Sequence, residues 1–174
     1  QYHNIHKIMN EAGLFTMGVD PESGGQGMPY TICMASYEYY SFHMGFMLYP
    51  EATAGAAHLI DAFGTDRQKK LYMEKMYAQE WGGTMCLTEA DAGSDVGALK
   101  TKAVKQADGT FKISGAKIFI TSGENDLFKN MVHPVLARIE GDPAGTKGIS
   151  IFIVPKYRVK EDGSMGEFND VHCT

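Results

Sequence analysis

The apolar residues of this chain change their spacing near residue 81, and this change constrains the fold more than any other feature. From Ala52 they recur at positions 52, 56, 59, 60 and 63, which is the spacing of one face of an α-helix. From Thr110 they alternate with polar residues, which is the spacing of a half-buried strand. Helices followed by strands, rather than alternating with them, predict an α+β fold with a boundary near Glu80.

The first 80 residues are predicted to be helical. One helix is expected to carry this apolar face from Ala52, with Pro50 in its first turn, and to end before Gly64, which suits a left-handed position. Thr65 and Gln68 have the spacing of a capping box at the start of the next helix. The glycine-rich stretch 22–29 is interpreted as a turn, because no strand precedes it and no Lys-Ser/Thr pair follows it, as a phosphate-binding loop would require.

Four strands are predicted after residue 81. Leu99–Gln106 and Thr110–Thr121 are expected to pair around the Asp108–Gly109 turn, and two more strands are expected over 131–139 and 148–154. Five lysines lie along the hairpin, and we expect them on a solvated strand face rather than in contact with coenzyme phosphates. They are Lys100, Lys102, Lys105, Lys112 and Lys117.

Composition excludes several classes of protein. Sixteen basic and 21 acidic residues leave a net charge of −5, which argues against nucleic-acid binding. The three cysteines form no metal-binding or disulfide pattern and favour a reducing compartment. Pro29–Tyr49 is long and mostly apolar, but Glu38 near its middle would cost about 2.5–3.5 kcal/mol in a membrane. A buried helix is therefore predicted there, with His43 as a core histidine.

The segment Met85–Asp95 concentrates the groups that carry chemistry. It combines the hydroxyls of Thr88 and Ser94 with Gly93 and several backbone N–H groups in a tight loop. Such a loop can approach an anion or the edge of a heterocycle closely. The alternative is that Ser94 or Asp95 only caps a short helix over 96–98, and the residues alone leave both interpretations open.

Thr88–Asp95 reads TEADAGSD, and similar stretches accompany it in order: Gly64–Lys69 with Trp81–Gly83, Lys112–Thr121 (KISGAKIFIT), and Gly145–Pro155. These blocks span about residues 22–155 and resemble the acyl-CoA dehydrogenase family, flavoenzymes that desaturate acyl thioesters. Ile118–Gly123 with Arg138–Gly141 is similar to the branch that includes the 3-methylmercaptopropionyl-CoA dehydrogenases.

The resemblance implies a helical domain over residues 1–80, followed by a mainly antiparallel, barrel-like β domain over residues 81–174. A C-terminal helical domain would lie outside this chain. It also implies FAD as cofactor and α,β-dehydrogenation of an acyl-CoA, with the hydride passing to flavin N5. The residues implied to contact FAD are Met85, Cys86, Leu87, Thr88, Gly93, Ser94, Phe119, Ile120 and Thr121.

Individual roles follow from the same resemblance. Thr88 is implied to meet the pyrimidine edge of the flavin, Thr121 its N5, and Phe119 with Ile120 its ring. Ser94 is implied to lie near the pyrophosphate and the bound acyl-CoA. Two positions depart from the pattern of many members: Ala90 stands where they have Pro, and Phe119 where they have Trp.

The family's catalytic Glu lies in the C-terminal domain, so no catalytic base is assigned here, and the chain alone is expected to be inactive. Glu89 is interpreted as structural. The resemblance implies acyl-CoA as substrate, an electron-transfer flavoprotein or oxygen as acceptor, and a homo-oligomer in fatty acid metabolism. A bacterial cytoplasmic location is expected, and an organelle-targeting segment upstream stays open. The alternative function is a non-catalytic module of the same fold that binds an acyl thioester or a flavin.

Overall fold

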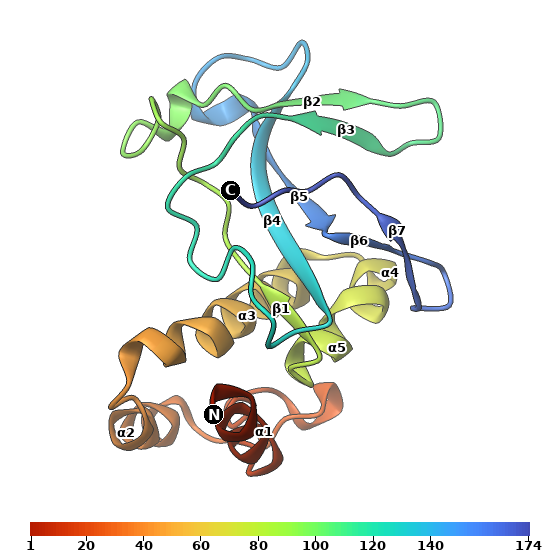
Figure 1. Ribbon diagram of the computed structural model, residues 1–174. Helices are drawn as coiled ribbons and strands as arrows, with labels where there is room; N and C mark the ends of the chain where they lie inside the picture. The colour runs from red at the N-terminus through yellow and green to blue at the C-terminus, as the bar shows by residue number, and fades with distance from the viewer. The chain divides into compact units, whose positions relative to one another are not determined.

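A computed structural model describes residues 1–174, which divide into two compact units (Figure 1). The first unit comprises residues 1–84, 121–132 and 155–174, and the second comprises residues 85–120 and 133–154. Strand β4 (Asn130–Ile139) contributes residues to both. Helices precede strands along the chain, which confirms the α+β class. The division into domains of residues 1–80 and 81–174 has other bounds than these two units, and it stays a prediction.

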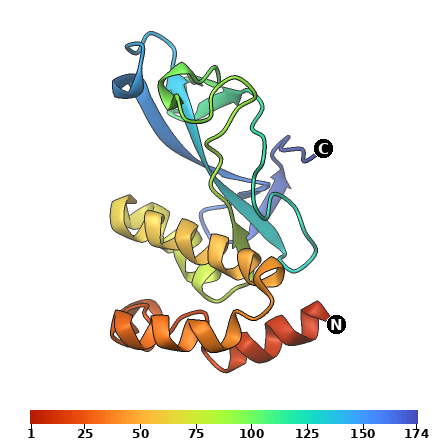
Figure 2. The same ribbon diagram turned by 90° about the vertical axis from the view of Figure 1, so that its left-hand side faces the viewer.

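The first unit is built on helices, and Figures 1 and 2 show α3 with α1 and α2 on one side and β1 on the other. Phe15, Phe46 and Met47 form a buried cluster against which α1, α2 and the 121–132 stretch pack. The helical elements are α1 (Tyr2–Glu11), η1 (Pro21–Ser23), α2 (Tyr30–Tyr40), α3 (Met44–Phe63), α4 (Asp66–Gln68), the π-helical η2 (Lys69–Met73) and α5 (Glu74–Tyr77).

Helix α3 begins at Met44, so Pro50, which was predicted to lie in the first turn, lies in the helix interior. Proline removes one backbone hydrogen bond from a helix. Phe46 and Met47, in the extra turns, are buried and favour continuing the helix through that position. His43 caps the start, because its Nδ1 accepts a hydrogen bond from the Phe46 N–H at 3.1 Å.

The predicted boundary between α3 and α4 is right, but the role given to Gly64 is wrong. Gly64 has an extended backbone (φ −75°), not a left-handed one. Its reason for being glycine is space, since a Cβ there would lie 2.4 Å from the Ile60 carbonyl oxygen. The capping box is confirmed: the Thr65 side chain accepts from Gln68 N–H, and the Gln68 side chain accepts from Thr65 N–H at 2.8 Å.

The single buried helix predicted over 29–49 is wrong. Residues 41–43 separate α2 from α3, and no residue of α2 is buried. His43 is exposed; the buried histidine of this unit is His6, whose Nε2 lies 3.2 Å from Gln79 Oε1. None of the helices has the length and apolar character needed to cross a membrane.

The strands of the first unit are short. β1 (Trp81–Gly83) pairs in parallel with the Asn130–Val132 part of β4, and β6 (Tyr157–Val159) pairs antiparallel with β7 (Met165–Phe168). Gly83 lies against α3, where its N–H donates to Thr53 Oγ1 at 3.0 Å. Trp81 is almost fully buried, with the Lys75 ammonium 4.7 Å from its ring centroid.

The second unit contains the predicted hairpin. β2 (Lys102–Lys105) pairs antiparallel with β3 (Phe111–Ser114), and Gly109 takes the left-handed conformation (φ +85°) that the turn requires. β2 also pairs in parallel with the end of β4, which in turn pairs with β5 (Ile149–Pro155). The pairing is therefore mixed, and the strand order β1-β4-β2-β3 does not close into a ring. Two short helices complete the unit, η3 (Val96–Ala98) and η4 (Thr146–Gly148).

The strand predicted over Thr110–Thr121 ends early, at Ser114. Gly115 lies so close to Thr101 that a Cβ would come within 2.3 Å of the Thr101 Oγ1. Beyond it, Phe119 has a positive φ of 57°, which a strand does not tolerate. Residues 115–121 form an irregular segment instead, and local alternation of apolar residues did not reveal this.

Candidate functional site

The loop Met85–Ser94 begins on the edge of β4. Cys86 N–H donates to Pro134 O at 2.8 Å, and Leu136 N–H donates to Cys86 O at 3.1 Å. Cys86 is buried, with its Sγ 4.0 Å from His133 Nδ1, whereas Met85 before it is 45% exposed. The backbone of the loop is therefore anchored at its start while one side of it stays open.

A tight turn follows the anchored start. Glu89 N–H donates to Ala92 O at 3.0 Å, and Ala92 N–H returns a bond to Glu89 O at 3.2 Å. These bonds leave Ala90 and Asp91 exposed at the tip and turn the Glu89 side chain inward. The position where many family members have Pro is thus held by backbone hydrogen bonds around Ala90.

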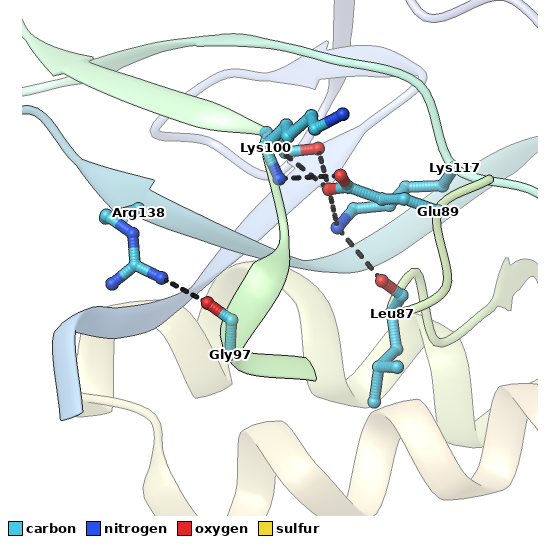
Figure 3. Close-up of polar contacts among 7 residues, drawn as sticks. Leu87, Glu89, Gly97, Lys100, Lys117 and Arg138 are labelled. Carbon is cyan, nitrogen blue, oxygen red and sulfur yellow. Dashed lines mark hydrogen bonds and ion pairs between the residues drawn. The ribbon is translucent and has the colours of Figure 1, made fainter. Parts of the chain in front are cut away.

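The Glu89 carboxylate is the best-connected group of the second unit (Figure 3). Its Oε1 accepts from Thr101 N–H at 3.0 Å, from Thr101 Oγ1 at 2.5 Å and from Lys117 Nζ at 2.8 Å. Its Oε2 accepts from Lys100 N–H at 2.6 Å. A buried carboxylate needs such donors to stay ionised.

The electrostatic result is a strongly acidic Glu89. Burial acts to raise the pKa of this carboxyl, but the hydrogen bonds from Lys117, Thr101 and the Lys100 and Thr101 backbone outweigh it and lower the pKa to about 2. At neutral pH the group is a carboxylate with its lone pairs engaged. The interpretation of Glu89 as a structural residue agrees with these contacts.

Lys117 joins a second segment to the loop. Its Nζ donates to Leu87 O at 3.0 Å as well as to Glu89, and the next residue, Ile118, donates its N–H to Thr88 O at 2.9 Å. Two stretches that the sequence analysis assigned to one cofactor therefore lie side by side within the second unit.

Three of the hydroxyl groups predicted to face the cofactor, those of Thr88, Ser94 and Thr121, make no hydrogen bond within the chain. Asp95 is the N-cap residue of the short helix η3, as the capping alternative expects, but neither its side chain nor that of Ser94 makes a capping hydrogen bond. A Cβ on Gly93 would meet nothing closer than 4.0 Å. An open loop with free hydroxyl donors fits a polar heterocycle and a phosphate group.

The remaining predicted residues differ in their surroundings. Phe119 is 90% exposed, and Ile120 is half-buried. Thr121 is exposed and is the first residue of the 121–132 stretch of the first unit. An aromatic ring left in water at a positive φ is unfavourable on both counts and suits a surface that another group covers.

Sequence reasoning missed two residues that hold this unit together. Lys117 was placed on a solvated strand face, but its side chain is only 9% exposed and pairs with Glu89. Arg138 donates to Gly97 O at 2.9 Å (Figure 3). It also donates to Gly145 O at 2.9 Å and to Pro143 O, and so ties two loops together. The signal for Lys117 was Glu89 itself, because a structural carboxylate inside a loop requires a buried cation.

Comparisons with known proteins agree with this geometry. The N-terminal domain of acyl-CoA dehydrogenases matches residues 1–80, and the middle domain matches residues 84–168. The chain is 45% identical over 173 residues to 3-methylmercaptopropionyl-CoA dehydrogenase of Ruegeria pomeroyi, covering 99% of this chain and 29% of that protein. It is 46% identical over 168 residues to a broad-specificity linear acyl-CoA dehydrogenase of Mycobacterium tuberculosis, covering 95% and 27%.

Solved structures show the same relationship. An acyl-CoA dehydrogenase from Bacillus anthracis, solved in complex with FAD, superposes with a TM-score of 0.75 at 32% identity over 90% of this chain and 26% of that chain. The chain thus spans less than a third of the length of these three relatives. Both family domains together account for nearly the whole sequence, and the chain belongs to the acyl-CoA dehydrogenase family.

Proposed function

We propose that this chain supplies the N-terminal helical and middle β domains, residues 1–80 and 81–174, of a FAD-dependent acyl-CoA dehydrogenase. The observation that carries the proposal is the structure of the Met85–Ser94 loop. Lys117 holds this loop through hydrogen bonds to Leu87 O and Glu89, while the hydroxyls of Thr88 and Ser94 make no hydrogen bond within the chain. Membership of the family supports it. The rest of the enzyme, including a C-terminal helical domain, lies outside these residues.

FAD, when bound, would supply the hydride-accepting chemistry. The chain's own residues would bind and orient it: Thr88 would donate to the pyrimidine edge, Ser94 to the pyrophosphate and the acyl-CoA, and Thr121 to N5. Phe119 and Ile120 would cover the ring and exclude water from one face. Hydroxyl donors placed where negative charge develops stabilise the transition state. Met85, Cys86, Leu87 and Gly93 line the same wall.

The proton-abstracting base is assigned to the part of the enzyme outside this chain. A general base works best with a pKa near the working pH and a free lone pair. Glu89 offers neither, since its pKa is about 2 and both its oxygens accept hydrogen bonds. The chemistry of this chain is therefore cofactor binding and orientation.

The proposal extends to the whole protein's surroundings. An acyl-CoA is the substrate, an electron-transfer flavoprotein is the electron acceptor, and the enzyme is a homo-oligomer in the bacterial cytoplasm. An oxidase of the same fold would instead pass its electrons to oxygen. To separate these two acceptors, turnover of the whole protein is measured with oxygen present, without oxygen, and with an acceptor dye in place of oxygen. Only an oxidase turns over with oxygen as its sole acceptor.

The test is a titration of the whole protein with FAD. Thr88→Val and Ser94→Ala each remove one proposed donor, and we expect the Kd for FAD to rise about 2- to 10-fold for each. Ser114→Ala, which removes an exposed hydroxyl on β3, is the matched control and should change nothing. Unchanged affinity in the first two variants contradicts the assigned contacts. Tight FAD binding without reduction by any acyl-CoA would favour a non-catalytic flavin- or thioester-binding module.

A further inference from the structure

We propose that Glu89 and Lys117 form a positioning pair that sets the geometry of the cofactor-facing loop; the inference rests on the proposed function. The two side chains are 8% and 9% exposed, and Lys117 Nζ lies 2.8 Å from Glu89 Oε1. Neither residue is among those proposed to contact the cofactor. Each is close in sequence to a residue that is, since Glu89 follows Thr88 and Lys117 comes two residues before Phe119.

The pair joins three segments that are far apart in the chain. Glu89 belongs to the loop and accepts from both backbone N–H groups of Lys100 and Thr101, 11 and 12 residues further on. Lys117 comes 28 residues after Glu89 and also holds Leu87 O. Figure 3 shows these groups converging on one carboxylate, with the Lys117 side chain lying across the loop.

No strand ladder holds the later segment in place. β3 ends at Ser114, and three hydrogen bonds join the irregular stretch to the loop: two from Lys117 Nζ and one from Ile118 N–H to Thr88 O. Lys117 makes two of these three bonds, so the position of Phe119 relative to Thr88 depends in large part on Lys117. Residues behind a site that lock its contacting groups are what keep it in the productive geometry.

A neighbouring ion pair provides the control. Asp91 of the same loop lies 2.7 Å from Lys100 Nζ, but both side chains are 72% exposed. Exposed pairs contribute little, because water and salt screen them. The two pairs therefore differ in burial and in the segments they join, while each pairs a carboxylate of the loop with a lysine outside it.

The experiment uses the whole protein and three variants: Lys117→Met, the double variant Glu89→Gln/Lys117→Met, and Asp91→Asn as control. We measure FAD affinity, the visible circular dichroism of bound FAD, kcat, and thermal unfolding. In Lys117→Met we expect altered dichroism and a kcat lower by about 100-fold, the effect of misplacing a reacting group by about 1 Å. Asp91→Asn should match the wild type in all four measurements.

The double variant separates positioning from stability. It buries no unpaired charge, so its unfolding temperature should recover relative to Lys117→Met. The two hydrogen bonds from Lys117 Nζ stay lost and only the backbone bond from Ile118 to Thr88 remains, so the dichroism and kcat should not recover. Wild-type dichroism and kcat in a folded Lys117→Met variant overturn the inference; if that variant does not fold, the double variant decides by the same criterion. Wild-type protein that binds no FAD overturns the proposed function itself, which is a different result.

Discussion

Glu89 carries its negative charge in a site from which water is nearly excluded. Four hydrogen bonds would be lost or weakened by protonating it, including both backbone bonds from Lys100 and Thr101. This one carboxylate therefore links the conformation of the loop to the acidity of the solution. The family signature contains Glu89, whereas the low pKa of Glu89 depends on hydrogen-bond partners elsewhere in the chain.

A pH dependence of stability follows with a definite sign. The pKa of Glu89 is lowered on folding from 4.5 to about 2, so its stabilisation is complete above pH 4.5 and is lost as the pH falls towards 2. The shift corresponds to a stabilisation of about 3 kcal/mol. We expect the free energies of unfolding of wild type and Glu89→Gln to differ most above pH 5 and to converge as the pH falls to the folded-state pKa of about 2 and below. Chemical denaturation across this range measures it, and a constant difference contradicts the assignment.

Two glycines of α3 and β1 have opposite surroundings, and only Gly83 of β1 lies at the contact between these two elements. A Cβ on Gly83 would lie 2.7 Å from Ala56 Cβ and 2.8 Å from Met76 Cε. Gly55 is exposed on the same helix, and a Cβ there would meet nothing within 4 Å. The strand can lie this close to α3 because Gly83 has no side chain.

These surroundings predict opposite effects of the same substitution. Gly83→Ala should destabilise the whole protein by about 1–3 kcal/mol, because the new methyl overpacks the contact. Gly55→Ala should stabilise it by about 0.5–1 kcal/mol, because alanine favours a helix interior. Thermal unfolding of both variants beside the wild type checks this. A neutral Gly83→Ala would mean that β1 and α3 are not in close contact.

At the scale of the whole molecule, residues 1–174 hold the proposed donors for FAD but no free catalytic carboxylate in the loop. We expect the isolated chain to show no acyl-CoA dehydrogenase activity with added FAD, acyl-CoA and an acceptor dye. A dye-reduction assay against a no-protein blank measures this. Turnover above the blank would place a base within these residues. Glu51 of α3 would then be the first to mutate, since burial raises its pKa, whereas Glu89 is engaged.

The sequence by itself determined the features that depend on neighbouring residues. The capping box of Thr65 and Gln68 and the turn at Asp108–Gly109 use contacts within a few residues. The change of apolar spacing near residue 81 separated helices from strands for the same reason. The family resemblance rests on short blocks of residues and was equally legible, while the cofactor contacts it implies stay predictions.

Only the tertiary structure decided which distant groups meet. Local spacing placed Pro50 in the first turn of α3, but burial of Phe46 and Met47 in their cluster carries the helix back to Met44. Alternation extended β3 to Thr121, but the approach of Gly115 to Thr101 ends it. In the sequence Lys117 is one of several lysines along a predicted strand, but in the structure its ammonium group pairs with Glu89, 28 residues away. A local pattern records which face of a segment is apolar, whereas the free energy of a buried charge depends on a partner that only folding brings near.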